Sequence, residues 1–458
     1  MHNAKIPRPP VGEFVGMNQS MQRMLITICG LGSVVAVLLV TARAQEVGIP
    51  ALPMSDPETV GMSSIRLDRI KTTMQRYIDD QRLAGVVTLI ARHGKVVHLE
   101  AQGWRDKEAD QRMTPDTIFT IMSMTKPIVS TALMVLYEEG HFLLDDPISK
   151  WIPGYANKEV RLNPESPDPQ VEPAVRPITV RHILTHTSGL SLHPDFRPSF
   201  GLPSRLGDFV RPRNTEEAIA RAADRPLAFH PGDQWQYGDS TDYVALLVEK
   251  MSGQNLQTFL QQRLFRPLGM NDTHYNVPRS KTNRVAAVYR HTGPHNTIEL
   301  FRTPSHLEPT FYYGGVAGLN STVSDYYLFH QMMLNGGELN GTRILSPRTI
   351  NLMISNHIGD KEVDVWGPGY GWGLGYCILT DPGRANEHLS PGSFFWTGAW
   401  NTISWVDPIE DMVAVAMTQV TPFGRINFLK DISVVASQAI VESNRHNPPT
   451  VLGYERRK

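Results

Sequence analysis

The chain has 458 residues, of which 41% are hydrophobic and 19% are charged. This is the composition of an ordinary globular protein, and the length suffices for one large domain or two. The 44 basic and 45 acidic residues leave a formal net charge of -1. Charge therefore gives no reason to expect a nucleic acid or an anionic membrane surface as a partner.

An apolar segment near the N-terminus has the pattern of a secretory signal. Residues 24–40 are apolar or small, Arg23 precedes them, and an Ala-Arg-Ala sequence ending at Ala44 follows. This pattern predicts cleavage after Ala44, a periplasmic or secreted protein, and no stable membrane insertion; an uncleaved anchor is the less favoured alternative. Cys29 lies inside the segment, so Cys377 alone would remain and no intramolecular disulfide is expected.

The first part of the mature chain predicts a helix followed by a hairpin. Apolar residues recur at helical spacing over residues 65–78. Two β-type runs, 86–91 and 95–99, flank the Arg-His-Gly sequence at 92–94, which is typical of a hairpin turn.

The middle of the chain is mainly helical by the same criteria. Short helices are predicted over residues 180–184, 215–223, 241–251 and 256–264. Residues 193–213 carry repeated Pro, Phe, Arg and Gly and are predicted to form a long loop, a candidate lid or pocket wall.

The last third returns to strands before a closing helix. Short β-type runs occupy residues 394–396, 402–406 and 412–417, and a helix is predicted over about 426–441. Strands at both chain ends with helices between them predict an α+β fold, in which helices flank a sheet built from both ends and a mostly α-helical subdomain is inserted. The predicted parts are a signal peptide at 1–44, an exposed leader at 45–60, and one domain at 61–458, with its α/β part at about 61–122 and 290–445 and its helical part at about 123–289.

The sequence Ser123-Met124-Thr125-Lys126 places a hydroxyl and an amine on one helix face, because residues i and i+3 are neighbours there. Pro127 is tolerated only in a first turn, so the helix begins close to Ser123. An amine held against an apolar helix is desolvated, which favours the neutral form that can take the serine proton. This spacing occurs by chance about once in a chain of this length, so the surrounding segments must decide its meaning.

Other segments supply what serine acyl transfer requires, namely a second proton-transfer group and donors for an oxyanion. Residues 229–239, FHPGDQWQYGD, contain Tyr237, and residues 395–399, FWTGA, are predicted to form an edge strand that a substrate can approach. In the stretch 183–190, ILTHTSGL, His186 is interpreted as part of a helix-ending turn rather than as a catalytic histidine.

Taken in order, these segments resemble the serine β-lactamase-like family, which holds class C β-lactamases, DD-peptidases and family VIII carboxylesterases. The resemblance extends from about Gly61 to Met417 and implies the β-lactamase/transpeptidase-like fold. The segments that carry it are Ser123-x-x-Lys126, residues 184–190, the F-x-P-G-x-x-W-x-Y stretch ending at Tyr237, and residues 267–270, 314–322, 371–375 and 396–398.

The resemblance implies roles for four residues. Ser123 would be the acylated nucleophile, Lys126 its activating base, and Tyr237 the other proton-transfer group. The backbone N–H groups of Ser123 and Ala399 would form the oxyanion hole. A helix start suits the Ser123 donor, because main-chain N–H groups are unpaired there and the helix dipole favours negative charge.

Two departures from the family pattern bear on the substrate. The residue before Thr-Gly, usually a cationic Lys or His, is Trp396, and the Tyr-x-Asn pattern ends in Asp239. The missing cation weakens recognition of a substrate carboxylate, and an ionised aspartate cannot donate to a substrate amide. Both changes favour a neutral, apolar ester as in the esterase branch, bound by Trp396, Thr397, Gly398 and Asp239. As alternatives, Asp239 would cap the following helix and Trp396 would only pack in its strand.

The sequence therefore predicts a secreted or periplasmic serine hydrolase, a carboxylesterase acting on small or medium acyl esters. The alternative within the same chemistry is a β-lactamase or DD-carboxypeptidase-like peptidase, and the alternative of another class is a non-catalytic homologue that binds peptidoglycan or acts as a scaffold. No serine has glycine at both −2 and +2, as the α/β-hydrolase elbow requires. A small ester or amide is the expected ligand; no cofactor or metal is expected, since the histidines lack ligand spacing. The oligomeric state does not follow from the sequence.

Overall fold

In the computed structural model, the described residues are 52–163, 170–190, 212–304 and 309–444. The chain divides into two compact units, Met1–Pro50 and Ala51–Lys458, and every element below belongs to the second. The predicted signal peptide lies outside the described residues, as does nearly all of the predicted loop at 193–213. Within the described part of the chain, no helix has the length and apolar character needed to cross a membrane.

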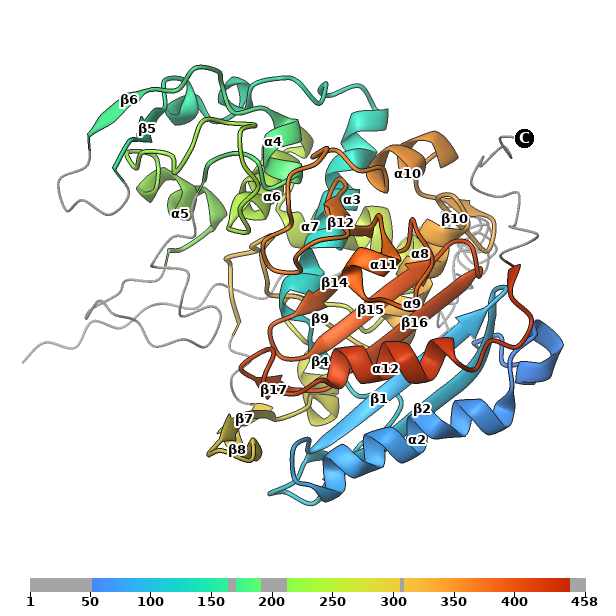
Figure 1. Ribbon diagram of the computed structural model, residues 1–458. Helices are drawn as coiled ribbons and strands as arrows, with labels where there is room; N and C mark the ends of the chain where they lie inside the picture. Colours follow the sequence, from blue (N-terminus) through green and yellow to red (C-terminus); the bar gives the residue numbers. More distant parts are fainter. Residues whose placement is uncertain (1–51, 164–169, 191–211, 305–308, 445–458) are drawn as a thin grey trace, which may run out of the picture. The chain divides into compact units, whose positions relative to one another are not determined.

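A single antiparallel sheet of eight strands joins the two ends of the chain (Figure 1). The strands from the early and late parts of the chain meet in the pairing between β1 and β16, with Val87 opposite Met417. The expected α+β fold, with its sheet built from both chain ends, is thereby confirmed. In spatial order the strands are β12 (Tyr370–Trp372), β13 (Cys377–Leu379), β14 (Phe394–Gly398), β15 (Thr402–Asp407), β16 (Met412–Met417), β1 (Gly85–Arg92), β2 (Lys95–Asp106) and β3 (Gln111–Arg112).

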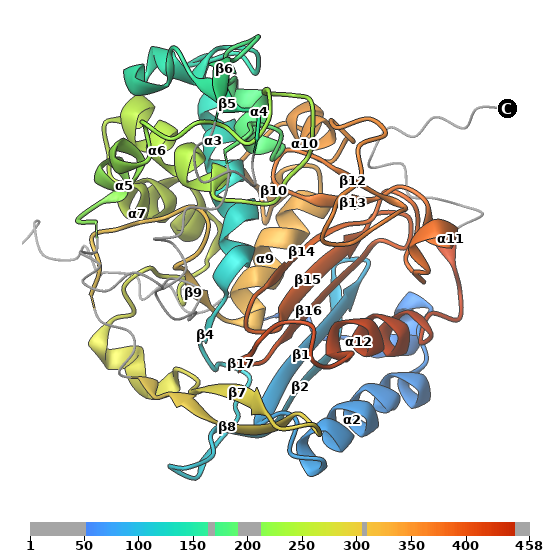
Figure 2. The same ribbon diagram turned by 60° about the vertical axis from the view of Figure 1, so that its left-hand side comes forward.

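Helices cover both faces of this sheet, which explains why β1 and β16 are buried along their whole length. Figures 1 and 2 show α2 (Ser64–Asp79) and α12 (Phe428–Ser437) side by side on one face. Figure 2 shows α9 (Val323–Leu334) on the other face, toward α3 (Thr125–Glu138). Alternate residues of β1 accordingly pack into two different hydrophobic clusters.

The part predicted to be helical contains α4, α5, α6, α7 and α8 in addition to α3. The short helices predicted there are present, but α5 ends at Arg221, two residues before its predicted end, and one helix differs further. The helix expected over 256–264 ends at Leu260, and the chain continues through a π-helical turn. The bounds are α4 (Val180–Leu184), α5 (Thr215–Arg221), α6 (Ser240–Ser252), α7 (Leu256–Leu260), the π-turn η6 (Gln261–Phe265) and α8 (Arg266–Leu268).

The remaining elements are short and lie around the sheet and the helical part. The strands are β4 (Phe119–Thr120), β5 (Glu159–Arg161), β6 (Val171–Pro173), β7 (Val288–Thr292), β8 (Thr297–Arg302), β9 (Asn320–Ser321), β10 (Glu338–Leu339), β11 (Thr342–Arg343) and β17 (Val420–Thr421). The helices are α10 (Pro347–Met353), α11 (Pro382–Ala385) and the 3₁₀ turns η1 (Pro57–Val60), η2 (Met122–Met124), η3 (Ile148–Lys150), η4 (Pro153–Tyr155) and η7 (Arg279–Arg284).

The described half of the predicted leader contains several exposed residues and also contacts the sheet, because Ser55 N–H donates to the Val96 carbonyl of β2 over 3.0 Å before η1 follows. One prediction about chain segments needs correction. The strand predicted to lie at an edge, β14, lies between β13 and β15. Its pairing with β13 covers only Phe394 and Phe395, however, so the part from Trp396 onward has a ladder partner on the β15 side alone.

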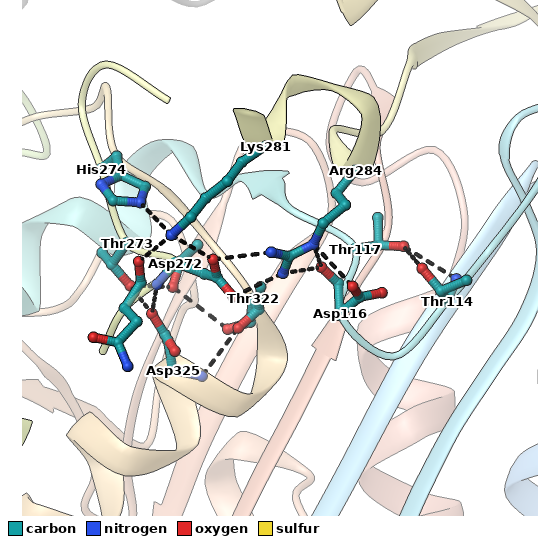
Figure 3. A network of polar contacts seen from close by, with 12 residues as sticks. Thr114, Asp116, Thr117, Asp272, Thr273, His274, Lys281, Arg284, Thr322 and Asp325 are labelled. Carbon is teal, nitrogen blue, oxygen red and sulfur yellow. Dashed lines mark hydrogen bonds and ion pairs between the residues drawn. The ribbon is translucent and has the colours of Figure 1, made fainter. Parts of the chain in front are cut away.

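A polar network fixes the start of α9 against the segment that follows α8 (Figure 3). Asp325 accepts hydrogen bonds from Asp272 N–H at 2.7 Å and from the Thr273 hydroxyl at 2.8 Å. Both oxygens of Asp272 accept from Arg284, at 3.0 and 2.7 Å, and Lys281 lies 2.9 Å from the same carboxylate. Bidentate, partly buried pairs of this kind hold geometry well.

The buried carboxyl of Asp325 makes the stability of this network depend on pH. Burial raises the pKa of Asp325 to about 7. Because the native pKa lies above that of the unfolded chain, native protein binds a proton that unfolded protein releases, and the free energy of unfolding falls as pH rises toward the native pKa. We expect the Tm of Asp325→Asn to rise relative to wild type between about pH 5 and about pH 8. Thermal unfolding of both proteins measures this, and an equal Tm difference at both pH values would contradict it.

Candidate functional site

The Ser123 hydroxyl and the Lys126 amine lie together at the start of α3. Ser123 belongs to the 3₁₀ turn η2, and the α-helix proper begins at Thr125. Lys126 Nζ lies 3.1 Å from Ser123 Oγ, the proximity that the spacing predicts. Met122, next to Ser123, has a φ of 48°, in the left-handed region that a side chain like methionine seldom adopts. Such strain in a backbone is often found at functional sites.

Lys126 is fully buried, and its partners are uncharged oxygens. Besides Ser123 Oγ, Nζ donates to the carbonyl of Val316 over 3.0 Å. The amine also lies over the face of the Tyr237 ring, 4.7 Å from the ring centroid. The structure therefore gathers the three residues to which the sequence assigned proton transfer and nucleophilic attack.

An aromatic cluster holds Tyr237 in place. The Trp396 indole N–H donates to Tyr237 Oη over 3.3 Å, and the two ring centroids are 5.1 Å apart. The His186 ring packs against the rings of Tyr237 and Trp372, with centroid distances of 5.0 and 5.1 Å. Burial, with the nearby charge of Lys126 adding to it, holds the pKa of His186 well below its usual range, so this ring is neutral. His186 has a φ of 56° just after α4, which agrees with its interpretation as a turn residue.

The end of β14 lies against the Ser123 turn. A Cβ at Gly398 would lie 2.5 Å from the Ile121 carbonyl oxygen, two residues before Ser123, so only glycine allows this approach. Ala399 packs with Met122 and Trp400 in one small apolar cluster. Both residues whose backbone N–H groups the sequence proposes as oxyanion donors are thus on adjoining segments.

Two further predicted site residues are buried beside this arrangement. Thr397 lies in β14 between Trp396 and Gly398. Asp239 is the N-cap residue of α6, the position that the capping alternative gave it, but its side chain makes no capping hydrogen bond there. The sequence did not predict that the Val316 carbonyl belongs to the site; the Gly-Gly pair before Val316 is the feature that could have indicated it.

In the described ranges, no three His, Cys, Asp or Glu side chains are grouped so that they could hold a metal ion.

Comparison with known proteins places the chain in a family. The family model for beta-lactamase matches residues 70–434. The chain belongs to the beta-lactamase family. The resemblance and the fold expected from the sequence are thereby confirmed, and the family's relatives support a hydrolase.

The relatives of this beta-lactamase family member include esterases and peptidase-like proteins. Protein Rv1367c of Mycobacterium tuberculosis is 31% identical over 82% of this chain and 94% of its own length. Esterase EstB of Burkholderia gladioli is 29% identical (79% and 93% covered), and a putative D-alanyl-D-alanine carboxypeptidase of Escherichia coli is 27% identical (84% and 89%). The solved structure of EstCE1, a hydrolase with promiscuous acyltransferase activity, superposes with a TM-score of 0.69 at 25% identity, covering 82% of this chain and 99% of that one.

Proposed function

We propose that this beta-lactamase family member is a secreted or periplasmic carboxylesterase that cleaves small or medium acyl esters through an acyl-enzyme on Ser123. The observation that carries the proposal is the buried Lys126 amine, 3.1 Å from Ser123 Oγ and over the Tyr237 ring. A nucleophile with a base within hydrogen-bond reach, and a third group that faces the base, is the arrangement that activated serine requires.

In the acylation step, Lys126 takes the proton of Ser123 while Oγ forms a bond to the ester carbonyl carbon. Negative charge develops on the carbonyl oxygen, which accepts hydrogen bonds from the N–H groups of Ser123 and Ala399. When the tetrahedral intermediate collapses, the bond to the alcohol oxygen breaks. Tyr237 passes a proton to that oxygen and is reprotonated from Lys126, so the alcohol leaves neutral.

In the deacylation step, a water molecule gives a proton to the same base system and its oxygen attacks the acyl carbon. The bond to Ser123 Oγ breaks, Oγ regains a proton, and a carboxylic acid leaves. In each step the base system passes on the proton that it takes, to the alcohol in acylation and to Ser123 Oγ in deacylation, so Ser123, Lys126 and Tyr237 end as they began.

The preference for a neutral ester rests on Trp396. Its indole offers no positive charge to a substrate carboxylate, and its N–H is already directed at Tyr237 Oη. An apolar side chain of this size, buried at the wall of the site, favours an uncharged acyl or alcohol group. The Burkholderia esterase among the relatives supports the same assignment.

Covalent labelling tests this function directly. We expect an ester-mimicking p-nitrophenyl phosphonate to form one adduct, mapped to Ser123 by peptide mass spectrometry, and the Ser123→Ala protein to form none. The wild type should also hydrolyse p-nitrophenyl butyrate faster than a chromogenic cephalosporin. Absence of an adduct on Ser123 would overturn the mechanism. A faster cephalosporin reaction would favour the second candidate, a β-lactamase or D-amino-acid peptidase. The similarity to the putative carboxypeptidase of Escherichia coli supports that candidate.

A further inference from the structure

A loop formed by residues 314–319 contacts both the first turn of α6 and the turn that carries Ser123. At its start, a Cβ at Gly315 would lie 2.0 Å from the Thr241 carbonyl oxygen, so the loop backbone rests directly on α6. At its end, Leu319 accepts a hydrogen bond from Ile121 N–H at 3.0 Å and donates to Thr125 Oγ1 at 3.3 Å. The 314–319 loop therefore bridges the helix that follows Tyr237 and the helix that carries Lys126.

One buried carboxylate in α6 holds this loop. Asp242 accepts from Val316 N–H at 2.9 Å through one oxygen and from the Tyr312 hydroxyl at 2.6 Å through the other. Its exposed fraction is 1%. Burial raises the pKa of Asp242, and the Tyr312 hydroxyl, the Val316 N–H and the charge of Lys126 act against that rise. A buried carboxylate with a donor on each oxygen is a strong tether, because hydrogen bonds to an ionised group are about twice as strong as neutral ones.

Val316, the residue that Asp242 tethers, is also a direct partner of the base Lys126. Val316 N–H binds Asp242, and the Val316 carbonyl accepts from Lys126 Nζ at 3.0 Å. Movement of the Val316 backbone would therefore move a direct partner of the amine. Among the described residues, Asp242 forms no hydrogen bond with Ser123 or Lys126, so its hydrogen-bonded link to them runs through Val316. The charge of Lys126 also acts on Asp242 directly.

We propose that Asp242 is a positioning residue, which holds the Val316 carbonyl where it aims the Lys126 amine at Ser123. This inference rests on the proposed function, since it assigns no reaction of its own. Because the amine has few partners, loss of one defined acceptor position lets Nζ turn away from Oγ. Misplacement of a catalytic group by about 1 Å can lower a rate by as much as about 100-fold. Substrate binding does not use this contact, so the effect falls on kcat.

The test compares Asp242→Asn with the wild-type protein. The amide keeps the size of the side chain but removes its charge and one of its two acceptors, so Val316 N–H is left at best with a weaker, uncharged acceptor. We expect kcat for p-nitrophenyl butyrate to fall by about 10-fold or more, with KM within about twofold of the wild type. Rates are expressed per site titrated to completion with the phosphonate, so unfolded protein does not enter kcat. Tyr312→Phe is the control: it leaves the Asp242 bond to Val316 intact, and kcat should stay within about threefold.

A second variant covers the case in which Asp242→Asn does not fold. Gly315→Ala places a methyl group against the Thr241 carbonyl and displaces the same loop while Asp242 stays in place, so it should lower kcat in the same way. A folded Asp242→Asn or Gly315→Ala protein with wild-type kcat would overturn the positioning role, as would a loss seen only in KM. Failure of the wild type to be labelled or to hydrolyse esters would instead overturn the proposed function, so the two failures are distinguishable.

Discussion

Replacement of Lys126 by methionine should lower kcat/KM for p-nitrophenyl butyrate by on the order of 10³- to 10⁴-fold, because the serine loses its base. Methionine fills most of the buried space that the lysine stem occupies, so packing changes little. It leaves Ser123 Oγ and the Val316 carbonyl without their common donor. Steady-state rates and the rate of phosphonate labelling measure the effect, and both should fall together.

A matched control exists in the helical part of the chain. Lys158 is also buried, donates to the backbone carbonyls of Ala223 and Arg225, and lies 5.3 Å from the Tyr155 ring centroid. Lys158→Met therefore removes a buried amine with a similar set of partners, and it should lower Tm while kcat/KM stays within about twofold. Equal losses of activity in the two variants would show that Lys126 acts only through stability.

The parts of the site that sequence could predict are local. Ser123 and Lys126 are three residues apart in a helical segment, so helix geometry alone brings them together. The hairpin of β1 and β2 and the amphipathic helix α2 were also predictable, because each buries residues at a period that the sequence displays. The order of the family's segments along the chain then assigned Tyr237 and Ala399 to the same site.

The parts that sequence could not predict depend on contacts between distant segments. Helix α9 is buried on nearly all sides, so it has no amphipathic stripe to reveal it. The bond between Asp242 and Val316 N–H joins residues 74 positions apart, and nothing local to either residue indicates it. The prediction that β14 is an edge strand was wrong because strand order is a property of the whole sheet. The small residues around Gly398 nevertheless indicated a close approach to the backbone, which the Ile121 carbonyl makes.

The second large effect concerns that glycine. Gly398→Ala is expected to lower kcat/KM by about 10²- to 10³-fold, the usual result of losing one oxyanion donor. An added Cβ would lie 2.5 Å from the Ile121 carbonyl oxygen and 2.2 Å from Thr402 Oγ1. The carbonyl is backbone leading into the Ser123 turn, so it cannot move aside as a flexible side chain would. The end of β14 must retreat instead, and the Ala399 N–H retreats with it.

Two comparisons separate this steric effect from a general effect of replacing glycine. Gly154→Ala is the control, because its Cβ would meet nothing closer than Ala223 Cβ at 3.5 Å, an ordinary contact, and activity should not change. In the double variant Gly398→Ala with Thr402→Ala, the clash with the threonine oxygen is removed but the clash with the Ile121 carbonyl remains. Activity should therefore not recover. Recovery in the double variant would mean that the Thr402 side chain, rather than the backbone before Ser123, limits how closely Ala399 approaches the nucleophile.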